Sequence, residues 1–155
     1  MRKLIYKIAK RICLAFEAPK PKVKLLKISS LQIKSEVDNM KLRMMYPALL
    51  DHYRDYYYLE PSQWADVFDY IYFVFDIPPY LAARFDCEDF AILLKGLVSS
   101  FFGLNAFAVV FGNTPRGYHG WNIFRTEDGW FQFEPQTGDV FELGQRGYVP
   151  EWVLI

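Results

Sequence analysis

The chain has 155 residues, of which 52% are apolar and 19% aromatic, and its basic and acidic residues balance to no net charge. This composition excludes a disordered chain and fits one domain whose core is dominated by aromatic rings. Two cysteines exclude a disulfide framework, and no paired Cys or His pattern indicates a zinc site. No apolar run reaches the roughly 18 residues that an ordinary membrane span needs.

The charged residues are unevenly distributed. Residues 1–34 hold ten Lys or Arg and one acid, whereas residues 35–155 hold eight Lys or Arg and seventeen acids. Such a basic arm favours contact with an anionic surface, a protein partner or the chain's own acidic body. The acidity of the body argues against nucleic acid binding through that part of the chain.

The first segment is predicted to be a short basic amphipathic helix, because apolar residues recur at helical spacing between lysines from Leu4 to Phe16. A helix docked on the body, or a frayed terminus, is the favoured interpretation, and a membrane-surface or partner-binding arm is the alternative. The Pro-Lys linker after Ala18 marks the domain boundary. We therefore expect an arm over 1–22 and a single domain over 23–155. We expect a cytoplasmic protein, bacterial or phage-encoded, with peripheral membrane association of the arm as an alternative.

The middle of the chain is predicted to be helical. Residues 23–34 are ambiguous, 38–58 favour a helix, and a second helix begins at Pro61, with Ser62 as its N-cap, and runs to Phe75.

Residues 87–102 give the clearest helical pattern, with Asp86 as N-cap and Gly103 as C-terminal cap. After Gly103 the apolar period changes and predicts a meander of strands over 106–111, 118–126 and 130–134, with a possible fourth beginning at Val140. Helices followed by an antiparallel meander indicate an α+β fold with one helix packed on a sheet.

Cys87 is the candidate nucleophile, because the unpaired N–H groups and the dipole at a helix N-terminus favour a thiolate. Asp86, Glu88 and Asp89 oppose that effect, so a cationic histidine partner is required. Taken alone, Cys87 also fits an ordinary small buried residue.

His119 is the candidate base, and it follows a Gly-containing loop at the start of a predicted strand. Glu134 ends the next strand and is the candidate for the group that orients the imidazole. A structural histidine and an exposed strand-end glutamate are the alternatives. A two-residue turn at Asp128-Gly129 would place Glu134 opposite Ile123, roughly 13 Å from His119 along the strand. A triad therefore needs a wider turn, a bulge or strand shear, and Gln136 is the fallback orienting group.

Three motifs together resemble the transglutaminase-like superfamily. The segment Asp86-Cys-Glu-Asp-Phe-Ala91 resembles the family's nucleophile motif. His119-Gly-Trp121, followed by Gly129-Trp130 and by Phe133-Glu-Pro-Gln-Thr137, resembles the family's His-x-Trp, Gly-Trp and Asp-Pro-Thr strand pair. The similarity covers about residues 85–140. Two departures are Glu134, where the family has Asp, and the absence of a Gly-Gly lead before Cys87.

The resemblance implies a papain-like α+β fold with N-terminal helices and a nucleophile-bearing helix packed on an antiparallel sheet. It implies that Cys87, His119 and Glu134 are catalytic. Trp121 is a candidate substrate-site wall, although core packing is the favoured interpretation, and Gln63 or Trp64 is a candidate side-chain donor to an oxyanion hole.

The function that we expect from these residues is cysteine-dependent hydrolysis of a carboxamide in a peptide or protein substrate, through an acyl-thioester and without cofactor or metal. Acyl transfer that cross-links proteins uses the same triad and stays open. A catalytically inactive binding module on the same fold is a further alternative, as is a protein whose basic arm is the main functional element.

Overall fold

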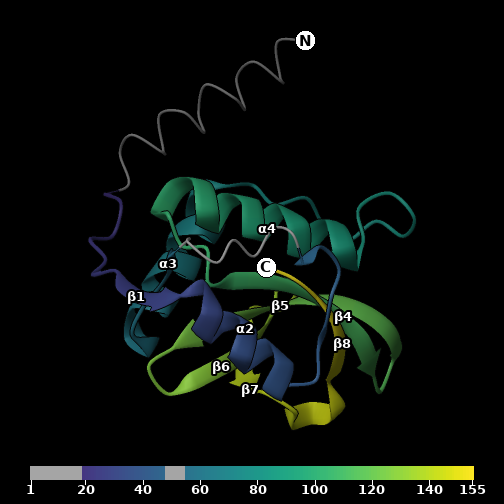
Figure 1. Ribbon diagram of the computed structural model, residues 1–155. Coiled ribbons are helices and arrows are strands. Elements are labelled where there is room, and N and C mark those ends of the chain that lie inside the picture. The colour runs from purple at the N-terminus through teal and green to yellow at the C-terminus, as the bar shows by residue number, and fades with distance from the viewer. Residues whose placement is uncertain (1–18, 48–54) are drawn as a thin grey trace.

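The computed structural model describes residues 19–47 and 55–155. Its centre is a six-stranded sheet in the order β2-β8-β4-β5-β6-β7 (Figure 1). Neighbouring strands are antiparallel except for the parallel pair β2–β8. The strands are β2 (Arg43–Met44), β4 (Phe107–Thr114), β5 (Gly117–Thr126), β6 (Gly129–Glu134), β7 (Asp139–Glu142) and β8 (Val149–Leu154), and a 3-10 turn, η2 (Gln145–Gly147), precedes β8.

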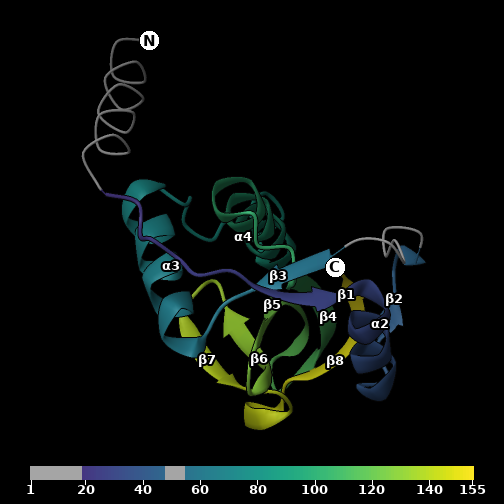
Figure 2. The same ribbon diagram turned by 60° about the vertical axis from the view of Figure 1, so that its left-hand side comes forward.

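Helices cover both faces of this sheet (Figures 1 and 2). The helix α2 (Ser30–Asn39) packs on one face, and α3 (Pro61–Val74) and α4 (Cys87–Phe102) pack on the other. Strand β4 contributes apolar side chains to both faces of the sheet. Ala108 and Val110 belong to the core on the α2 side, whereas Phe107 belongs to the core on the α3–α4 side. Side chains alternate along a strand, so a strand buried on both faces is a continuous apolar run.

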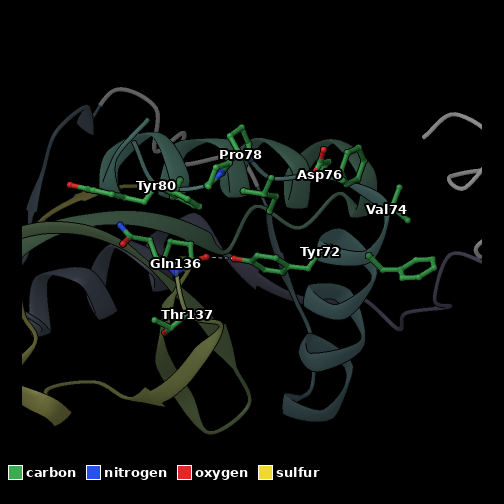
Figure 3. Close-up of a pocket in the computed structure, with 13 residues that line it drawn as sticks. Tyr72, Val74, Asp76, Pro78, Tyr80, Gln136 and Thr137 are labelled. Atoms are coloured by element: carbon green, nitrogen blue, oxygen red, sulfur yellow. Dashed lines mark hydrogen bonds between the residues drawn. The ribbon is translucent and has the colours of Figure 1, made fainter. Parts of the chain in front are cut away.

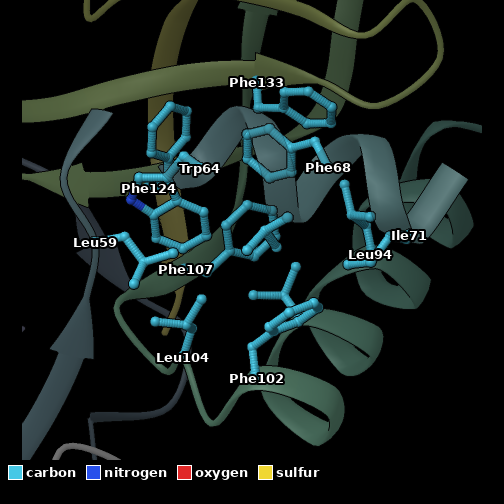
Figure 4. Close-up of a cluster of buried hydrophobic side chains, with 12 residues drawn as sticks. Leu59, Trp64, Phe68, Ile71, Leu94, Phe102, Leu104, Phe107, Phe124 and Phe133 are labelled. Carbon is cyan, nitrogen blue, oxygen red and sulfur yellow. The ribbon is translucent and has the colours of Figure 1, made fainter. Parts of the chain in front are cut away.

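The core on the α3–α4 side is largely aromatic (Figure 4). The ring of Trp64 lies 5.0–5.6 Å from those of Phe68, Phe107 and Phe124, and Phe68 stacks on Phe133 at 4.1 Å. These residues come from α3, β4, β5 and β6, so one cluster of rings fixes α3 on the sheet.

A second, two-stranded sheet pairs β1 (Leu26–Ser29) with β3 (Asp55–Tyr58) in antiparallel register. The helix predicted over 38–58 is therefore wrong for the described part of that range. α2 ends at Asn39, Lys41 adopts φ 58°, and Arg43–Met44 and Asp55–Tyr58 are strands. Aromatic and β-branched residues fit a paired strand, and pairing with β1 decides the conformation of the Tyr56–Tyr58 run.

Several local predictions agree with the structure. α4 spans Cys87–Phe102 with Asp86 at its N-cap and Gly103, at φ 68°, at its C-cap. The meander strands occur as β4 to β7, whereas β8 was not predicted. The N-cap of α3 is Glu60 rather than Ser62. The predicted basic helix falls on residues 1–18, which lie outside the described residues. No helix of the described ranges is long and apolar enough to cross a membrane.

Candidate functional site

His119 and Glu134 form a close side-chain pair at the end of the β5–β6 hairpin. The distance from His119 Nε2 to Glu134 Oε2 is 2.7 Å, and the glutamate is 5% exposed. The two residues are brought together by the position of the hairpin turn. Thr126 pairs with Gly129, so the turn residues are Glu127 and Asp128, one position earlier than expected.

This earlier turn shifts the register by two residues. Asn122 pairs with Phe133, so Glu134 comes level with Trp121 rather than with Ile123. The remaining offset from His119 is two residues, roughly 7 Å along a strand, and two long side chains on the same face span it. No bulge or shear between β5 and β6 is needed.

Glu134 has two further partners. The Tyr148 hydroxyl donates to its Oε2 at 3.2 Å, and the backbone N–H of Gln136 donates to its Oε1 at 3.1 Å. The side chain of Gln136 therefore does not replace Glu134 as the partner of His119. Because three donors converge on one buried carboxylate, Glu134 holds together β5, the turn after β6 and the segment before β8.

Cys87 is half-buried at the first position of α4, and its sulfur contacts Glu88 and Gly120. Its Sγ lies 3.3 Å from Glu88 Oε2, and the backbone N–H of Gly120 bonds the sulfur. Gly120 is the glycine of the His-Gly-Trp motif, and a Cβ there would lie 3.3 Å from the Cα of Glu88. α4 thus crosses β5 directly over Gly120, and this close approach favours a glycine.

The environment of Cys87 favours the neutral thiol. Burial raises the pKa of the thiol above its ordinary value, and Glu88 and Asp86 raise it further, although the Gly120 N–H acts in the opposite direction. Among the hydrogen bonds of the described residues, His119 bonds Glu134 and none joins it to Cys87. The structure thus pairs His119 with Glu134 but leaves the thiol outside that pair.

The first turn of α4 is acidic. The backbone N–H of Asp86 donates to Asp89 Oδ2 at 3.2 Å, which closes a capping box at the helix start. The donor atoms of Asp86, Cys87 and Glu88 lie within 4.8 Å of one another, a spacing that a shared metal ion could use. A hydrogen bond from the Asp86 carboxyl to the Glu88 carboxylate raises the pKa of Asp86 and lowers that of Glu88.

The other candidate site residues lie in or near the core. Trp64 is 1% exposed and donates its Nε1–H to the carbonyl of Arg125, at 2.8 Å. Trp121 is fully buried and donates to Gln132 Oε1 at 2.9 Å. Gln63 is partly buried, and its Oε1 has no hydrogen-bond partner. Neither tryptophan lines any of the three principal pockets of the described residues.

A pocket of about 710 Å³ lies beside the His119–Glu134 pair, and its residues were not identified from the sequence (Figure 3). It is bounded by the end of α3, the loop that follows it, Phe90 of α4 and the turn after Glu134. Its thirteen lining residues are Tyr72, Phe73, Val74, Phe75, Asp76, Ile77, Pro78, Pro79, Tyr80, Phe90, Pro135, Gln136 and Thr137. Only the fold places the Ile77-Pro-Pro-Tyr80 run opposite Pro135–Thr137.

The pocket adjoins the candidate triad through the chain itself. Pro135 directly follows Glu134, and Phe90 lies one helical turn after Cys87. The Tyr72 hydroxyl donates to the carbonyl of Pro135, so α3 is tied to the turn that carries the polar side of the pocket (Figure 3).

Comparison with known proteins finds matches among solved structures. No family model matches the chain, and no curated protein matches it. The PSL1a–E64 complex matches with TM-score 0.66 at 20% identity over 84% of this chain and 51% of that chain. The lectin of Polyporus squamosus bound to the epitope Neu5Acα2-6Galβ1-4GlcNAc matches with TM-score 0.62 at 19% identity over 84% of this chain and 50% of that one. The chain thus spans about half the length of these proteins, and the likeness defines the fold alone.

These matches correct the identification made from the motifs. The solved structures that share the fold include a lectin, and no family model, that of the transglutaminase-like superfamily included, matches the chain. The assignment to that superfamily and the papain-like fold class are therefore replaced by a fold shared with these structures, built on a six-stranded, partly parallel sheet. The motifs misled because short Cys, His and acid patterns at helix and strand ends recur on unrelated folds.

The predicted activity is corrected on the same finding. One of the structures of similar fold is a lectin bound to a glycan epitope, and no family model supports the expected cysteine hydrolysis of a peptide carboxamide. The acyl-transferase alternative and the transglutaminase-like binding-module alternative are withdrawn together with the family assignment.

Proposed function

We propose that this chain binds a carbohydrate in the pocket between α3, α4 and the turn after Glu134. The observation that carries the proposal is the combination of aromatic rings and hydrogen-bonding side chains around a cavity of about 710 Å³. That volume lies within the roughly 300–1,000 Å³ of small-ligand sites. The lectin of similar fold, which binds a trisaccharide epitope, supports the ligand class.

The apolar side of the pocket suits the C–H faces of a sugar ring. Phe73 is 66% exposed and Tyr80 54% exposed, and Tyr72 projects from the same end of α3. Large aromatic side chains gathered at one exposed pocket indicate a binding surface more often than isolated ones do. A flat ring offers extensive contact while its own rotamers lose little entropy on binding.

The polar side suits sugar hydroxyls, each of which donates one hydrogen bond and accepts others. Gln136 supplies an amide that both donates and accepts, and Asp76 supplies a carboxylate acceptor. The Thr137 hydroxyl already donates to Asp139 Oδ2, at 3.0 Å, so its oxygen is held in place as an acceptor.

The pocket is also fixed before a ligand arrives. Pro78, Pro79 and Pro135 restrict its two walls, and the hydrogen bond from Tyr72 to the Pro135 carbonyl joins them. Walls that are already ordered lower the entropy cost of binding a small ligand.

The proposal is tested by measuring binding of a panel of neutral mono- and disaccharides, including Galβ1-4GlcNAc, by isothermal titration and saturation-transfer NMR. We expect Tyr80→Ala to weaken binding at least tenfold. Tyr46→Ala is the matched control, because Tyr46 is 64% exposed but lines a different pocket. Absence of binding to every saccharide in the panel, or equal loss in the two variants, would refute the proposal.

We also propose that Cys87, His119 and Glu134 form the polar end of the same site. This extension is supported by the direct connection of Glu134 to Pro135 and of Cys87 to Phe90 through one turn of α4. In a Cys13→Ser background, a bound saccharide should slow alkylation of Cys87. Binding that leaves the alkylation rate unchanged would place the three residues outside the site.

A further inference from the structure

The segment that leads into β1 is basic and carries no acid. Residues 19–34 contain five lysines and neither Asp nor Glu. Four of these lysines are exposed and lie close together in the chain, namely Lys20, Lys22, Lys24 and Lys27. Figure 2 shows the purple segment that carries them running along the outside of the domain to β1. A surface that gathers cations in this way attracts an anionic partner.

Contacts with the body hold this segment in place. Lys20 Nζ donates to the carbonyl of Phe101, at the end of α4, and Val23 packs against the aromatic core on the α3–α4 side. Lys22 and Lys24, on either side of Val23, are exposed instead. The fold therefore fixes the backbone of the segment and presents two of its lysines outward.

Apolar side chains are exposed beside these lysines. Leu25 follows Lys24 and is 44% exposed, and Phe101, which Lys20 contacts, is 38% exposed. Residues 20–25 together with Phe101 are here called the basic stripe. Cations next to exposed apolar groups match the surface of an anionic bilayer, where phosphates lie directly above the hydrocarbon boundary. A nucleic acid or an acidic protein surface engages the charges but gains little from the apolar groups.

The arm that precedes the basic stripe has the same two properties in its sequence. Residues 1–18 lie outside the described residues, and they include five Lys or Arg and one acid. Apolar residues recur between these cations at helical spacing, a pattern typical of a helix that lies in a membrane interface. Residues 35–155 have the opposite excess, with seventeen acids against eight Lys or Arg. An anionic surface therefore attracts one end of the chain and repels the rest, which orients the protein.

We propose that residues 1–25 seat this protein on an anionic phospholipid bilayer, with the arm in the interface and the basic stripe against the headgroups. This proposal goes beyond carbohydrate binding and does not rest on it. Each cation near an anionic leaflet strengthens the attraction, which salt screens, so binding depends on the lysines of the stripe and on ionic strength.

The test measures co-sedimentation of the full chain with vesicles of phosphatidylcholine alone and of an equimolar mixture of phosphatidylcholine and phosphatidylserine. We expect at least tenfold stronger partition into the mixed vesicles at low salt, and a steep fall as salt is added. The double variant Lys22→Glu, Lys24→Glu should lower that partition at least tenfold. Ile8→Gln keeps every charge and should lower it severalfold, because an apolar side chain of the arm is lost.

The matched control is the double variant Lys34→Glu, Lys41→Glu. It makes the same change in net charge at exposed positions in and just after α2, on the opposite face of the sheet from α4, and should leave the partition nearly unchanged. Thermal melting of each variant checks that its fold is intact.

Three results would overturn the proposal. Equal partition into the two kinds of vesicle would show that anionic lipid is not the partner. Equal loss in the two double variants would show an effect of overall charge rather than of the basic stripe. Partition that Ile8→Gln leaves unchanged would show adsorption of cations without seating in the interface. The vesicles carry no saccharide, so none of these results bears on the proposed carbohydrate binding.

Discussion

His119 Nε2 and Glu134 Oε2 lie 2.7 Å apart although fifteen residues separate them in the chain. The hairpin turn at Glu127–Asp128 sets the register that makes this contact possible. Through its three hydrogen bonds Glu134 forms a junction between β5, the turn that follows β6 and the segment leading to β8.

The first prediction concerns the stability of that junction. Glu134→Gln keeps the size of the side chain but replaces one acceptor oxygen by a donor, so at least one of three hydrogen bonds is lost. We expect a loss of about 1–3 kcal/mol in the free energy of unfolding, measured in urea. Glu127→Gln, at an exposed turn position, is the control and should change little. Equal stability of the two variants would show that the junction contributes nothing.

The second prediction concerns the reactivity of Cys87. Because burial and Glu88 raise the pKa of the thiol, alkylation in a Cys13→Ser background should be slow at pH 7 and should rise steeply above pH 8. Glu88→Gln should speed alkylation at pH 8, since it removes a negative charge beside the sulfur and replaces one acceptor oxygen by an N–H donor. His119→Ala should have little effect. A rate that stays high well below pH 8 and depends on His119 would instead reveal an activated Cys–His pair.

The third prediction concerns Glu36 of α2. Burial alone would raise the pKa of its carboxyl, but hydrogen bonds from Arg125 and Trp130 outweigh burial and lower the pKa. A lowered folded-state pKa adds stability above the unfolded pKa of about 4.3, and that stability is lost as pH falls through the folded value.

Glu36→Gln should therefore lower the free energy of unfolding at pH 7 by about 1–3 kcal/mol and flatten its fall below about pH 4. Asp38→Asn removes a carboxylate whose partner, Lys34, is exposed, and it should cost much less. Urea unfolding at pH 3, 5 and 7 separates the two variants, and parallel pH profiles for them would contradict the prediction.

The fourth prediction uses two glycines as a matched pair. A Cβ at Gly112 would lie 2.1 Å from the carbonyl oxygen of Val149, so Gly112→Ala must push β8 away from β4. We expect a loss of about 2–3 kcal/mol in thermal or urea unfolding. Gly96 lies within α4 with nothing within 4 Å, and Gly96→Ala should stabilise the protein by about 0.5–1 kcal/mol. Changes of the same sign at both positions would contradict the packing described for β4 and β8.

The fifth prediction concerns alkaline pH. Burial and the charge of Glu134 raise the pKa of the Tyr72 hydroxyl, so its contribution to stability is present below pH 10 and is lost as pH rises further. Tyr72→Phe should flatten the fall in melting temperature above pH 10. Tyr46→Phe, at an exposed position, should leave that fall unchanged, and identical profiles for the two variants would rule out the effect.

Local sequence patterns predicted what local interactions decide. The periodicity after Asp86 and the glycine at position 103 were enough to define α4, because capping and amphipathic spacing act within a few turns. The hairpin strands followed from alternation and turn residues. The same reasoning failed over 38–58, where pairing of Asp55–Tyr58 with β1 overrides the helical spacing.

The candidate site shows the same division. The pairing of His119 with Glu134 was expected, but the turn that achieves it was placed one residue too late. The roles of Cys87, His119 and Glu134, the domain boundary near residue 22 and the cellular location all stay predictions. The aromatic pocket could not be predicted, because its walls come from α3, α4 and the turn after β6.

The sequence by itself determined the capped helix at Cys87, the β5–β6 hairpin and the excess of acid over base in residues 35–155. Only the tertiary structure decided the place of β8 between β2 and β4, the pairing of β1 with β3 and the assembly of the pocket. The physical reason is the range of the interactions. Caps, turns and amphipathic periods are decided within a few residues, whereas strand order and a pocket depend on contacts between segments whose meeting no local pattern encodes.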